Sequence, residues 1–463
     1  MKPTSLQEIA VQCGGELVSG DGAVLVDTVS TDTRSLAGGE LFVALAGDNF
    51  DAHDFLGQAT GAGVAAVLVS RDDLSTDSVG KAAVIRVADT LVGLQSLAAA
   101  QREVLDPKVV AITGSSGKTS TKDMLSAVLA KKFSVNATLG NLNNHIGLPL
   151  TVLATQPDHE AVVWELGMNH RGEIAPLAAI AKPDVAVITN VGVAHIEHLG
   201  TREEICAEKG DLLGALGADG VAIFPDADDY ADQLEARCPG RSIRTAIDAP
   251  ATVSARGLVV QADGATRFTL DCDGDVAEVT LAVPGRHMVS NALLAAAVGH
   301  YYEISAAQIA EALAGITLTG GRLERRDLNG VSLLDDSYNA NPESMAAALY
   351  TLGEIPCAGR RIAVLGRMAE LGDIRETEHR RAGAIAAEAK IDLLCTVGDE
   401  ADWIGLGAQE ATDSPEHHHF SDHTACAEFL SRTISPGDNL LLKGSRSARM
   451  EAVLETLSLA PTR

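Results

Sequence analysis

The segment VVAITGSSGKTST, residues 109–121, carries the strongest structural signal in this chain. Residues 109–113 are mostly β-branched, which is typical of a buried strand. A turn of glycine and serine then leads into Lys118 and Thr119, and a helical pattern follows over residues 120–129. The backbone N–H groups of such a turn, backed by a helix N-terminus, form a cradle for polyphosphate. The segment therefore predicts an α/β domain that holds a nucleotide by its phosphates.

The residues after this strand match the chemistry of a phosphate-binding loop. We expect Lys118 to reach the β- and γ-phosphates of ATP and the Thr119 hydroxyl to hold Mg²⁺. The spacing departs from the standard G-x-x-x-x-G-K-[ST] pattern, because Ile112 stands where that pattern has its first glycine. The alternative is an ordinary tight turn with a solvated lysine. The expected ATP-binding residues of the loop are Gly114, Ser115, Ser116, Gly117, Lys118, Thr119 and Ser120.

Size and composition restrict the class of protein. A chain of 463 residues suggests about two to four domains. Aromatic residues make up only 3% of the chain, so the core must consist mainly of Ala, Val, Leu and Ile. The net charge of −27 argues against nonspecific binding to nucleic acid or to an anionic membrane. Seven scattered cysteines without a C-x-x-C motif favour reduced thiols, and the chain shows no apolar signal or membrane span, so we expect a cytoplasmic protein.

Alternating Val-rich and Ala/Leu-rich stretches predict three α/β units. Residues 1–106 form a small α/β domain, and residues 316–463 form a Rossmann-like α/β domain. Residues 107–315 combine a parallel sheet with a small antiparallel sheet over 251–283, where polar and apolar residues alternate. Glu416 and the histidines at 417–419 resemble a metal-binding cluster, but no further ligand is spaced with them, so a solvated loop is expected there. The expected strands are 41–47, 65–70, 109–113, 161–166, 184–191, 220–225, 331–338, 361–366, 393–398 and 439–445, and the clearest further helices are 88–105 and 291–302.

Polar side chains follow several of these strands, at the sheet edge where ligands of doubly wound folds bind. Glu165 can hold Mg²⁺ directly or through water, or it is a surface carboxylate at a strand end. His195 is either a metal ligand or a structural group. The amides of Asn141, Asn143 and Asn144 suit sugar or phosphate recognition, with a set of Asx-turns as the alternative.

Three further groups leave two interpretations open. The local sequence does not mark Lys209 as a functional residue, since a lysine among carboxylates on a helix normally forms ion pairs on the surface. His287 and Asn291 are four residues apart, so they share a helix face that either frames a planar base or caps the helix. In the third unit the candidate nucleotide and substrate contacts, with structural ion pairs as the alternative, are Arg322, Asp336, Tyr338, Asn341 and Arg446.

Taken together, ordered strings across all three units resemble the Mur ligase family. The resemblance implies an ATP-dependent amide ligase that builds the peptide of bacterial cell-wall precursors. It also implies that the first domain binds a UDP-sugar-peptide substrate, the central domain binds ATP, and the third binds the incoming amine. The strings are TDTRSLAGGELFVALAGDNFDAHDF (31–55), TGSSGKTSTKDM (113–124), TLGNLNNHIGLP (138–149), ELGMNHRGEI (165–174), TNVGVAHIEHLGT (189–201), PGRHMVSNALLAAA (284–297), DDSYNANPESM (335–345), VLGRMAELG (364–372) and LLKGSRSARME (441–451).

Two of these strings, DDSYNANPESM and VLGRMAELG, resemble those of the family member that adds D-Ala-D-Ala to UDP-MurNAc-tripeptide. The resemblance implies that the tripeptide carboxylate attacks the γ-phosphate of ATP, and that the dipeptide amine then displaces phosphate from the acyl phosphate. Two alternatives stay open. One is another amide ligase of the superfamily, either an enzyme that adds an amino acid to UDP-MurNAc-dipeptide or a folylpolyglutamate synthetase. The other is a P-loop ATPase without ligase chemistry.

The resemblance also implies roles for individual positions in a monomeric enzyme with small-molecule substrates. Lys118, Glu165, His195 and Lys209 are expected to be catalytic. Thr119 and Glu165 would serve one Mg²⁺, and His195 with a carbamylated Lys209 would serve a second. The expected nucleotide contacts beyond the loop are Asn141, His287, Asn291, Arg322 and Asp336. The expected substrate contacts are Ser30, Thr31, Asp32, Arg34, Asn49, Phe50, Asp51, His53 and Asn144, with Tyr338, Asn341 and Arg446 facing the dipeptide. Arg367 and Pro225 depart from the family pattern, which leaves the contacts near them open.

Overall fold

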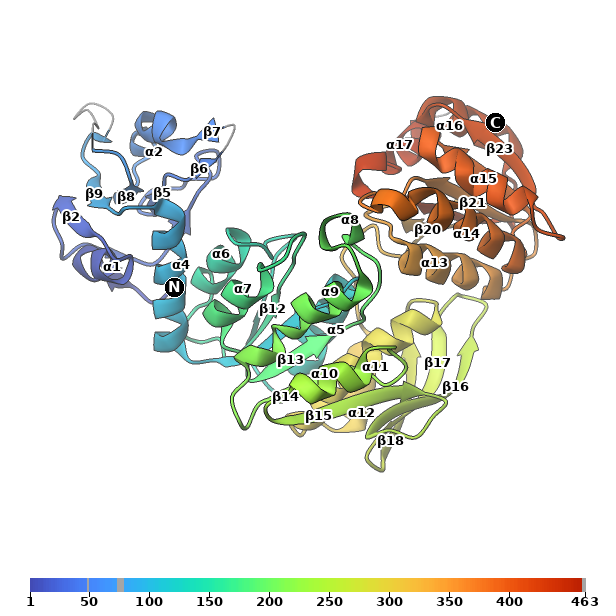
Figure 1. Cartoon of the computed structure of the whole chain (residues 1–463), viewed down its shortest axis with the longest axis horizontal. Helices are drawn as coiled ribbons and strands as arrows, with labels where there is room; N and C mark the ends of the chain where they lie inside the picture. The colour runs from blue at the N-terminus through green and yellow to red at the C-terminus, as the bar shows by residue number, and fades with distance from the viewer. Residues whose placement is uncertain (48–49, 73–78, 460–463) are drawn as a thin grey trace.

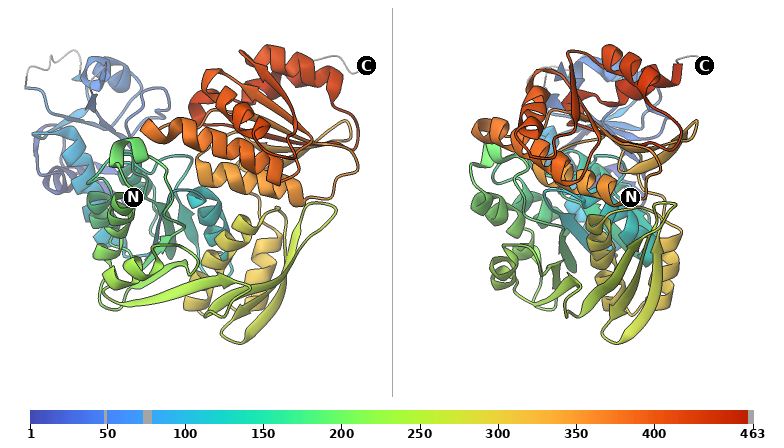
Figure 2. Two further views of the ribbon diagram at one scale, coloured as in Figure 1. Left: turned by 45° about the vertical axis from the view of Figure 1, so that its right-hand side comes forward. Right: turned by 90° about the vertical axis from the view of Figure 1, so that its right-hand side faces the viewer.

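The computed structural model describes residues 1–47, 50–72 and 79–459. It contains three lobes, each built on a β-sheet, and the N-terminal and C-terminal lobes lie at opposite ends of the central lobe (Figures 1 and 2). This confirms the predicted α/β class. The N-terminal lobe runs from β1 (Thr4–Ser5) to α4 (Thr90–Leu105), the central lobe from β10 (Lys108–Thr113) to α12 (Ala306–Ala314), and the C-terminal lobe from β19 (Glu324–Leu328) to α17 (Glu451–Leu459).

The N-terminal lobe contains a five-stranded sheet in the order β2-β9-β8-β5-β4, in which only β2 is antiparallel to its neighbour. The strand expected at 41–47 is divided, because β5 ends at Val43 and the chain then forms a separate two-stranded pair, β6 with β7. The elements are α1 (Leu6–Gln12), β2 (Glu16–Ser19), β3 (Leu25–Val26), β4 (Val29–Ser30), β5 (Leu41–Val43), β6 (Ala46–Gly47), β7 (Phe50–Asp51), η1 (Ala52–Phe55), α2 (Leu56–Gly61), β8 (Ala66–Val69) and β9 (Ala83–Arg86).

The central lobe contains a nine-stranded sheet in the order β11-β12-β10-β13-β14-β15-β16-β17-β18. Antiparallel pairing over 251–283 is confirmed, but these strands extend the edge of the parallel sheet instead of forming a sheet of their own. Phe268 and Leu270 share one apolar core with Val110 and Ile112, so both parts bury their faces together. The strands are β11 (Val135–Ala137), β12 (Ala161–Glu165), β13 (Val185–Ile188), β14 (Val221–Pro225), β15 (Arg241–Ile247), β16 (Val253–Val260), β17 (Thr266–Cys272) and β18 (Asp275–Leu281). The helices are α5 (Lys118–Leu129), α6 (Gly147–Leu153), α7 (Ile174–Ala181), α8 (Ile196–Leu199), α9 (Arg202–Gly210), η2 (Leu213–Ala215), α10 (Ala231–Arg237) and α11 (Arg286–Tyr301).

Helices cover both faces of this sheet. Because successive side chains of a strand point to opposite faces, Val110 and Ile112 of β10 pack with α5 and α11, whereas Val109 and Ala111 pack with α6 and α7. A strand buried on both faces is apolar throughout, which explains the continuous run in the sequence. Trp164, on β12 directly before Glu165, lies in the second of these cores and is 1% exposed.

The C-terminal lobe contains a six-stranded sheet in the order β19-β20-β24-β21-β22-β23, parallel except for β19. The solvated loop expected at 417–419 is wrong: these histidines lie on the edge strand β23, where alternate side chains reach the two faces of the sheet. The elements are β20 (Val331–Asp336), α13 (Pro342–Glu354), β21 (Arg361–Gly366), η3 (Gly372–Ile374), α14 (Arg375–Glu388), β22 (Leu393–Val397), η4 (Asp399–Ala401), α15 (Asp402–Gln409), β23 (Glu416–Phe420), α16 (His423–Thr433), β24 (Asn439–Lys443) and η5 (Arg446–Ala448).

The described residues include neither a membrane-spanning helix nor a cluster of typical metal ligands. No helix among residues 1–47, 50–72 and 79–459 has the length and apolar character that crossing a bilayer requires. The same residues include no cluster of three or more His, Cys, Asp or Glu side chains placed to hold a metal ion.

Candidate active site

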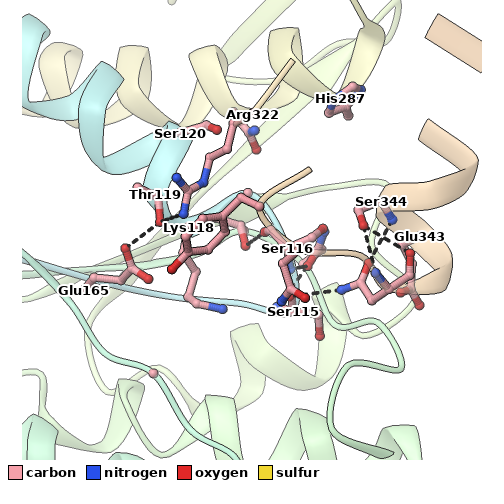
Figure 3. Close-up of a pocket in the computed structure, with 18 of the residues that line it drawn as sticks. Ser115, Ser116, Lys118, Thr119, Ser120, Glu165, His287, Arg322, Glu343 and Ser344 are labelled. Atoms are coloured by element: carbon pink, nitrogen blue, oxygen red, sulfur yellow. Dashed lines mark hydrogen bonds between the residues drawn. The ribbon is translucent and has the colours of Figure 1, made fainter. Parts of the chain in front are cut away.

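The carboxyl ends of three neighbouring strands bring three of the four expected catalytic residues together, namely Lys118, Glu165 and His195. In the sheet register, Ile112 of β10 lies beside Glu165 of β12, and Thr113 lies beside Ile188 of β13. The residues that follow these strands therefore meet at one edge of the sheet, where the order of strands along the chain changes direction around β10. They open into a cavity of about 640 Å³ whose walls come from the central and C-terminal lobes (Figure 3). This volume lies in the range of small-molecule sites.

The glycine-rich loop has the predicted position between β10 and α5. Gly117 adopts a left-handed φ of 80°, and α5 begins directly after it. The segment after β13 supports the loop: Asn190 Oδ1 accepts from the backbone N–H groups of Ser115 and Ser116, at 3.0 and 2.9 Å. The first turn of α5 still offers backbone N–H groups without intrahelical partners, which is the feature an anionic phosphate needs.

Two cations flank the loop. Lys118 is half-buried and its Nζ donates to the Gly114 carbonyl at 2.6 Å. Burial lowers the pKa of Lys118, the Glu165 carboxylate opposes that shift and the Arg322 guanidinium adds to it. Arg322 donates from Nη2 to the Thr119 hydroxyl at 3.1 Å, while its Nη1 is buried with no hydrogen-bond partner in the described chain. An unpartnered buried donor beside a phosphate loop fits a phosphate oxygen.

Oxygen atoms suited to a divalent cation lie beside the loop. The Thr119 hydroxyl donates to Glu165 Oε2 at 3.0 Å (Figure 3). Asn143 Nδ2 donates to Glu165 Oε1 at 2.9 Å. Glu165 is 3% exposed. A buried carboxylate, a hydroxyl and an amide together supply the hard oxygen donors that Mg²⁺ prefers, so these residues fit the ion expected here.

His195 and Lys209 lie close enough to Lys118 for its positive charge to lower the pKa of both. The left-handed φ of His195, 65°, places it as the N-cap of α8. Burial lowers the pKa of His195, which favours the neutral imidazole. Lys209, on α9, is 1% exposed, and its side chain makes no hydrogen bond or ion pair with any described residue. Burial holds the pKa of Lys209 well below its usual range, and the positive charge of Lys118 depresses it further. A neutral buried amine is the form of lysine that reacts with CO₂ to give a carbamate.

The far wall of the cavity comes from α11 and the C-terminal lobe. His287 and Asn291 both line it, and burial lowers the pKa of His287 to about 4. The Arg322 guanidinium lies 4.0 Å from the centre of the Tyr338 ring. Asp336 forms an ion pair with Lys443 at 2.5 Å, and burial raises the pKa of Asp336.

The cavity includes most, but not all, of the expected residues. Asn141, Asn144, Ser120 and Asn341 line it, and Asn341 Nδ2 donates to the Ser115 carbonyl at 3.2 Å. Arg446 does not belong to the described lining of the cavity. Its side chain is exposed, and its Nη1 pairs with Glu451 Oε1 at 2.8 Å. Lys209 is likewise buried behind the described lining instead of forming part of it.

The expected uridine-diphosphate residues belong to the N-terminal lobe and contact one another instead of the cavity. Asp32 pairs with Arg34 at 2.7 Å, and Asp51 Oδ1 lies 2.6 Å from His53 Nδ1. The remaining members of this group with a described position are Ser30 and Thr31 before Asp32, and Phe50, which stacks on Phe55. Asn49 lies outside the described residues.

Sequence reasoning assigned no individual role to several polar residues that line the cavity, among them Asn143, Asn190, Glu343 and Lys443. Asn190 and Lys443 follow or end buried strands, so the same strand-end argument that identified Glu165 could have found them. For Asn143 the sequence supports only the interpretation that it shares with Asn141 and Asn144. Glu343 lies in the first turn of α13 and accepts from the Val193 N–H at 2.7 Å, a contact between lobes that has no signal in the sequence.

A substitution in the loop tests the importance of its backbone shape. We expect Gly117→Ala to weaken ADP binding by about tenfold or more, because a left-handed alanine costs about 1–2 kcal/mol. A Cβ at this position would also lie 2.7 Å from Asn291 Oδ1. Isothermal titration with ADP measures the effect. The matched control is Gly274→Ala, since Gly274 has a φ of 91° in the β17–β18 hairpin with open space around it. Unchanged ADP affinity in the Gly117 variant would contradict the phosphate-loop assignment.

These features define an α/β nucleotide-binding protein whose phosphate site is completed by a second lobe. Two family models match the chain: the Mur ligase middle domain over residues 112–299, and the Mur ligase glutamate ligase domain over residues 321–446. The chain belongs to the Mur ligase family.

Relatives and solved structures agree with this membership. The chain is 39% identical to the UDP-N-acetylmuramoyl-tripeptide–D-alanyl-D-alanine ligase of Bacillus subtilis, with 94% of each chain covered. It is 38% identical to the protein of that name from Escherichia coli, with 99% of each chain covered. Among solved structures it is similar to MurF from Acinetobacter baumannii, with a TM-score of 0.90, 32% identity and 99% of each chain covered. It is also similar to MurF from Thermotoga maritima in complex with ADP, with a TM-score of 0.82, 29% identity, and 93% and 96% of the two chains covered.

Proposed function

We propose that this protein is an ATP-dependent ligase that joins D-alanyl-D-alanine to UDP-MurNAc-tripeptide and so produces the UDP-MurNAc-pentapeptide precursor of peptidoglycan. The observation that carries this proposal is similarity over nearly the whole length to enzymes of that name, at 38–39% identity. The cavity between the lobes supports it, because an acyl-transfer reaction needs a nucleotide, a carboxylate and an amine side by side.

The proposed reaction is the one that the resemblance to the family implies, and the charges of the cavity suit it. A carboxylate oxygen of the tripeptide forms a bond to the γ-phosphorus of ATP, the bond to the β-phosphate oxygen breaks, and ADP leaves. The dipeptide amine then attacks the acyl carbon, loses a proton, and expels phosphate. Lys118 and Arg322 counter the negative charge of the transferred group, while the loop amides hold it in line.

The remaining roles belong to the same proposal. Mg²⁺, when bound, supplies charge neutralisation for the triphosphate, and Thr119, Glu165, His195 and a carbamylated Lys209 are the residues that would hold two such ions. His287 and Asn291 frame the adenine, and Asp336, whose carboxylate pairs with Lys443, meets the ribose. Asn141 and Asn144 lie beside the nucleotide and the acceptor.

The lobes divide the substrates between them. Residues 1–106 bind the UDP-sugar peptide through Ser30, Thr31, Asp32, Arg34, Asn49, Phe50, Asp51 and His53. Residues 107–315 bind ATP, and residues 316–463 bind the dipeptide through Tyr338, Asn341 and Arg446. The exposed position of Arg446 suits a carboxylate that arrives from solvent. We also propose a monomeric, cytoplasmic enzyme, which agrees with the acidic charge and the reduced cysteines.

Release of ADP measured against defined substrate pairs tests this function. We expect rapid ADP release only with ATP, Mg²⁺, UDP-MurNAc-tripeptide and D-Ala-D-Ala together, since the amine is needed to discharge the acyl phosphate. UDP-MurNAc-dipeptide with an amino acid, and a folate with glutamate, are the controls that represent other amide ligases. Faster turnover with either control pair would overturn the assigned substrates. Equal ADP release without any acceptor or amine would instead identify a simple ATPase.

A further inference from the structure

The C-terminal lobe contributes a carboxylate to the residue that the proposed function makes a metal ligand. Glu370 lies in the loop between β21 and η3, and its Oε2 forms a short hydrogen bond with His195 Nδ1 of the central lobe. The two residues are 175 positions apart in the chain. Both have left-handed backbones, with φ of 65° at His195 and 60° at Glu370. Such conformations are uncommon outside glycine, and the structure maintains one on each side of the contact.

The backbone around Glu370 is docked as well. The Glu197 N–H donates to the Glu370 carbonyl at 3.2 Å. Gly372 has a φ of 51° and packs against α8, where a Cβ at this position would lie 3.4 Å from Glu197 Cα, in van der Waals contact. The loop therefore meets α8 through a side-chain bond, a backbone bond and a packing contact. Together, these three contacts fix the Glu370 carboxylate relative to the His195 ring, although the Glu370 side chain remains 41% exposed.

The contact determines what His195 can offer to the cavity. A carboxylate at Nδ1 accepts a hydrogen bond from the Nδ1–H group, so the neutral ring carries its proton on Nδ1 and its free lone pair on Nε2. Nε2 has no hydrogen-bond partner in the part of the chain that is described, and His195 lines the cavity. Histidines that bind metals generally donate their other ring N–H to a carboxylate or carbonyl in this way. Here that carboxylate comes from a different lobe.

We propose that Glu370 is a positioning residue that orients His195 and fixes its tautomer, so that the His195 part of the site is assembled only when the C-terminal lobe is docked on α8. This inference rests on the proposed function of His195. The C-terminal lobe would then have two roles, since it would orient His195 as well as bind the dipeptide. The ligand nitrogen becomes available in the same lobe arrangement that brings Arg322 to Thr119 and Asn341 to Ser115.

The test compares Glu370→Ala and Glu370→Gln with the matched control Glu376→Ala, whose exposed carboxylate pairs only with Arg380 in the described chain. We expect Glu370→Ala to lower kcat for ligation by about 10–100-fold with little change in KM for ATP. Glu370→Gln should recover part of the loss, because its amide oxygen still accepts from Nδ1. The control should behave as the unmodified protein.

A binding measurement gives a readout independent of turnover. Electron paramagnetic resonance with Mn²⁺ and ADP reports how many ions bind and how tightly. We expect the weaker Mn²⁺ site to lose about 10–100-fold in affinity in Glu370→Ala, while the tighter site is unchanged. Equal Mn²⁺ binding and equal kcat in the unmodified protein and in both Glu370 variants would overturn the proposal.

A double-mutant cycle separates positioning from a structural effect. If Glu370 acts through His195, the variant His195→Ala with Glu370→Ala should be no slower than His195→Ala alone. Losses that multiply would overturn the proposal, because Glu370 would then act independently. Glu370→Gln preserves side-chain volume, so the cycle can be repeated with it if the alanine variant does not fold. Failure of the proposed function is distinguishable, since the unmodified protein would then not ligate, while Mn²⁺ binding would still report on Glu370.

Discussion

Lys118→Ala should abolish ligation, with a loss of kcat of at least about 100-fold. Removal of one preorganised charge or hydrogen-bond donor at a developing negative charge typically costs two to three orders of magnitude. Lys118 begins α5 at the phosphate loop, and burial makes each of its electrostatic interactions stronger than in water. Steady-state ADP release with the complete substrate mixture measures the effect.

The control for this variant is Lys131→Ala, in the same lobe. Lys131 pairs with Glu311 on the protein surface at 2.9 Å, away from the cavity, and its loss should leave turnover within about twofold. Thermal denaturation should show that both variants are folded, so that the loss of turnover in Lys118→Ala reports the missing charge and not unfolding. Near-normal turnover of Lys118→Ala would refute its role at the γ-phosphate.

Lys209→Ala should be nearly inactive, and small carboxylates should restore part of its activity. Lys209 is buried without an ion pair in the described chain, and its lowered pKa favours the free amine. The amine nitrogen forms a bond to the carbon of CO₂ and releases a proton, which converts a cation into a carboxylate-like oxygen donor. Truncation to alanine removes these oxygens and leaves a space that acetate or formate can enter.

Rescue distinguishes the carbamate from a structural lysine. We expect turnover of Lys209→Ala to rise at least about tenfold as acetate or formate is added, reflecting restored oxygen ligation. Lys182→Ala is the control, since Lys182 is a surface residue that pairs with Glu103. Carboxylates should change the turnover of neither the control nor the unmodified protein. If acetate and formate fail to restore any activity at all tested concentrations, the carbamate role is refuted.

The sequence could predict the parts of this site that follow buried strands. The loop after β10 and Glu165 after β12 were found because parallel strands buried on both faces are readable as apolar runs, and their carboxyl ends meet at one edge. The position of His195 after β13 followed from the same geometry. These predictions needed only local patterns and one rule of sheet topology.

Contacts that join distant segments could not be read from local patterns. Lys209 looks like a surface residue on a charged helix, and only packing shows that it is buried. Arg446 looked like a cavity residue, but its side chain turns to Glu451. The edge strand β23 was missed because three consecutive histidines lack the apolar alternation of a typical strand. Each of these outcomes depends on tertiary packing, which outweighs local propensity.

The placement of the two tryptophans has a practical consequence for spectroscopy. Trp164 lies one residue before Glu165 in the central lobe, and Trp403 lies on α15 in the C-terminal lobe, with its ring centre 5.9 Å from that of His379. A Trp403→Phe protein therefore carries a single indole fluorophore, Trp164, which is shielded from solvent quenchers. One peptide bond joins Trp164 to Glu165, the carboxylate proposed to hold Mg²⁺. Its emission gives an optical signal for events at the base of the nucleotide cavity without an attached dye.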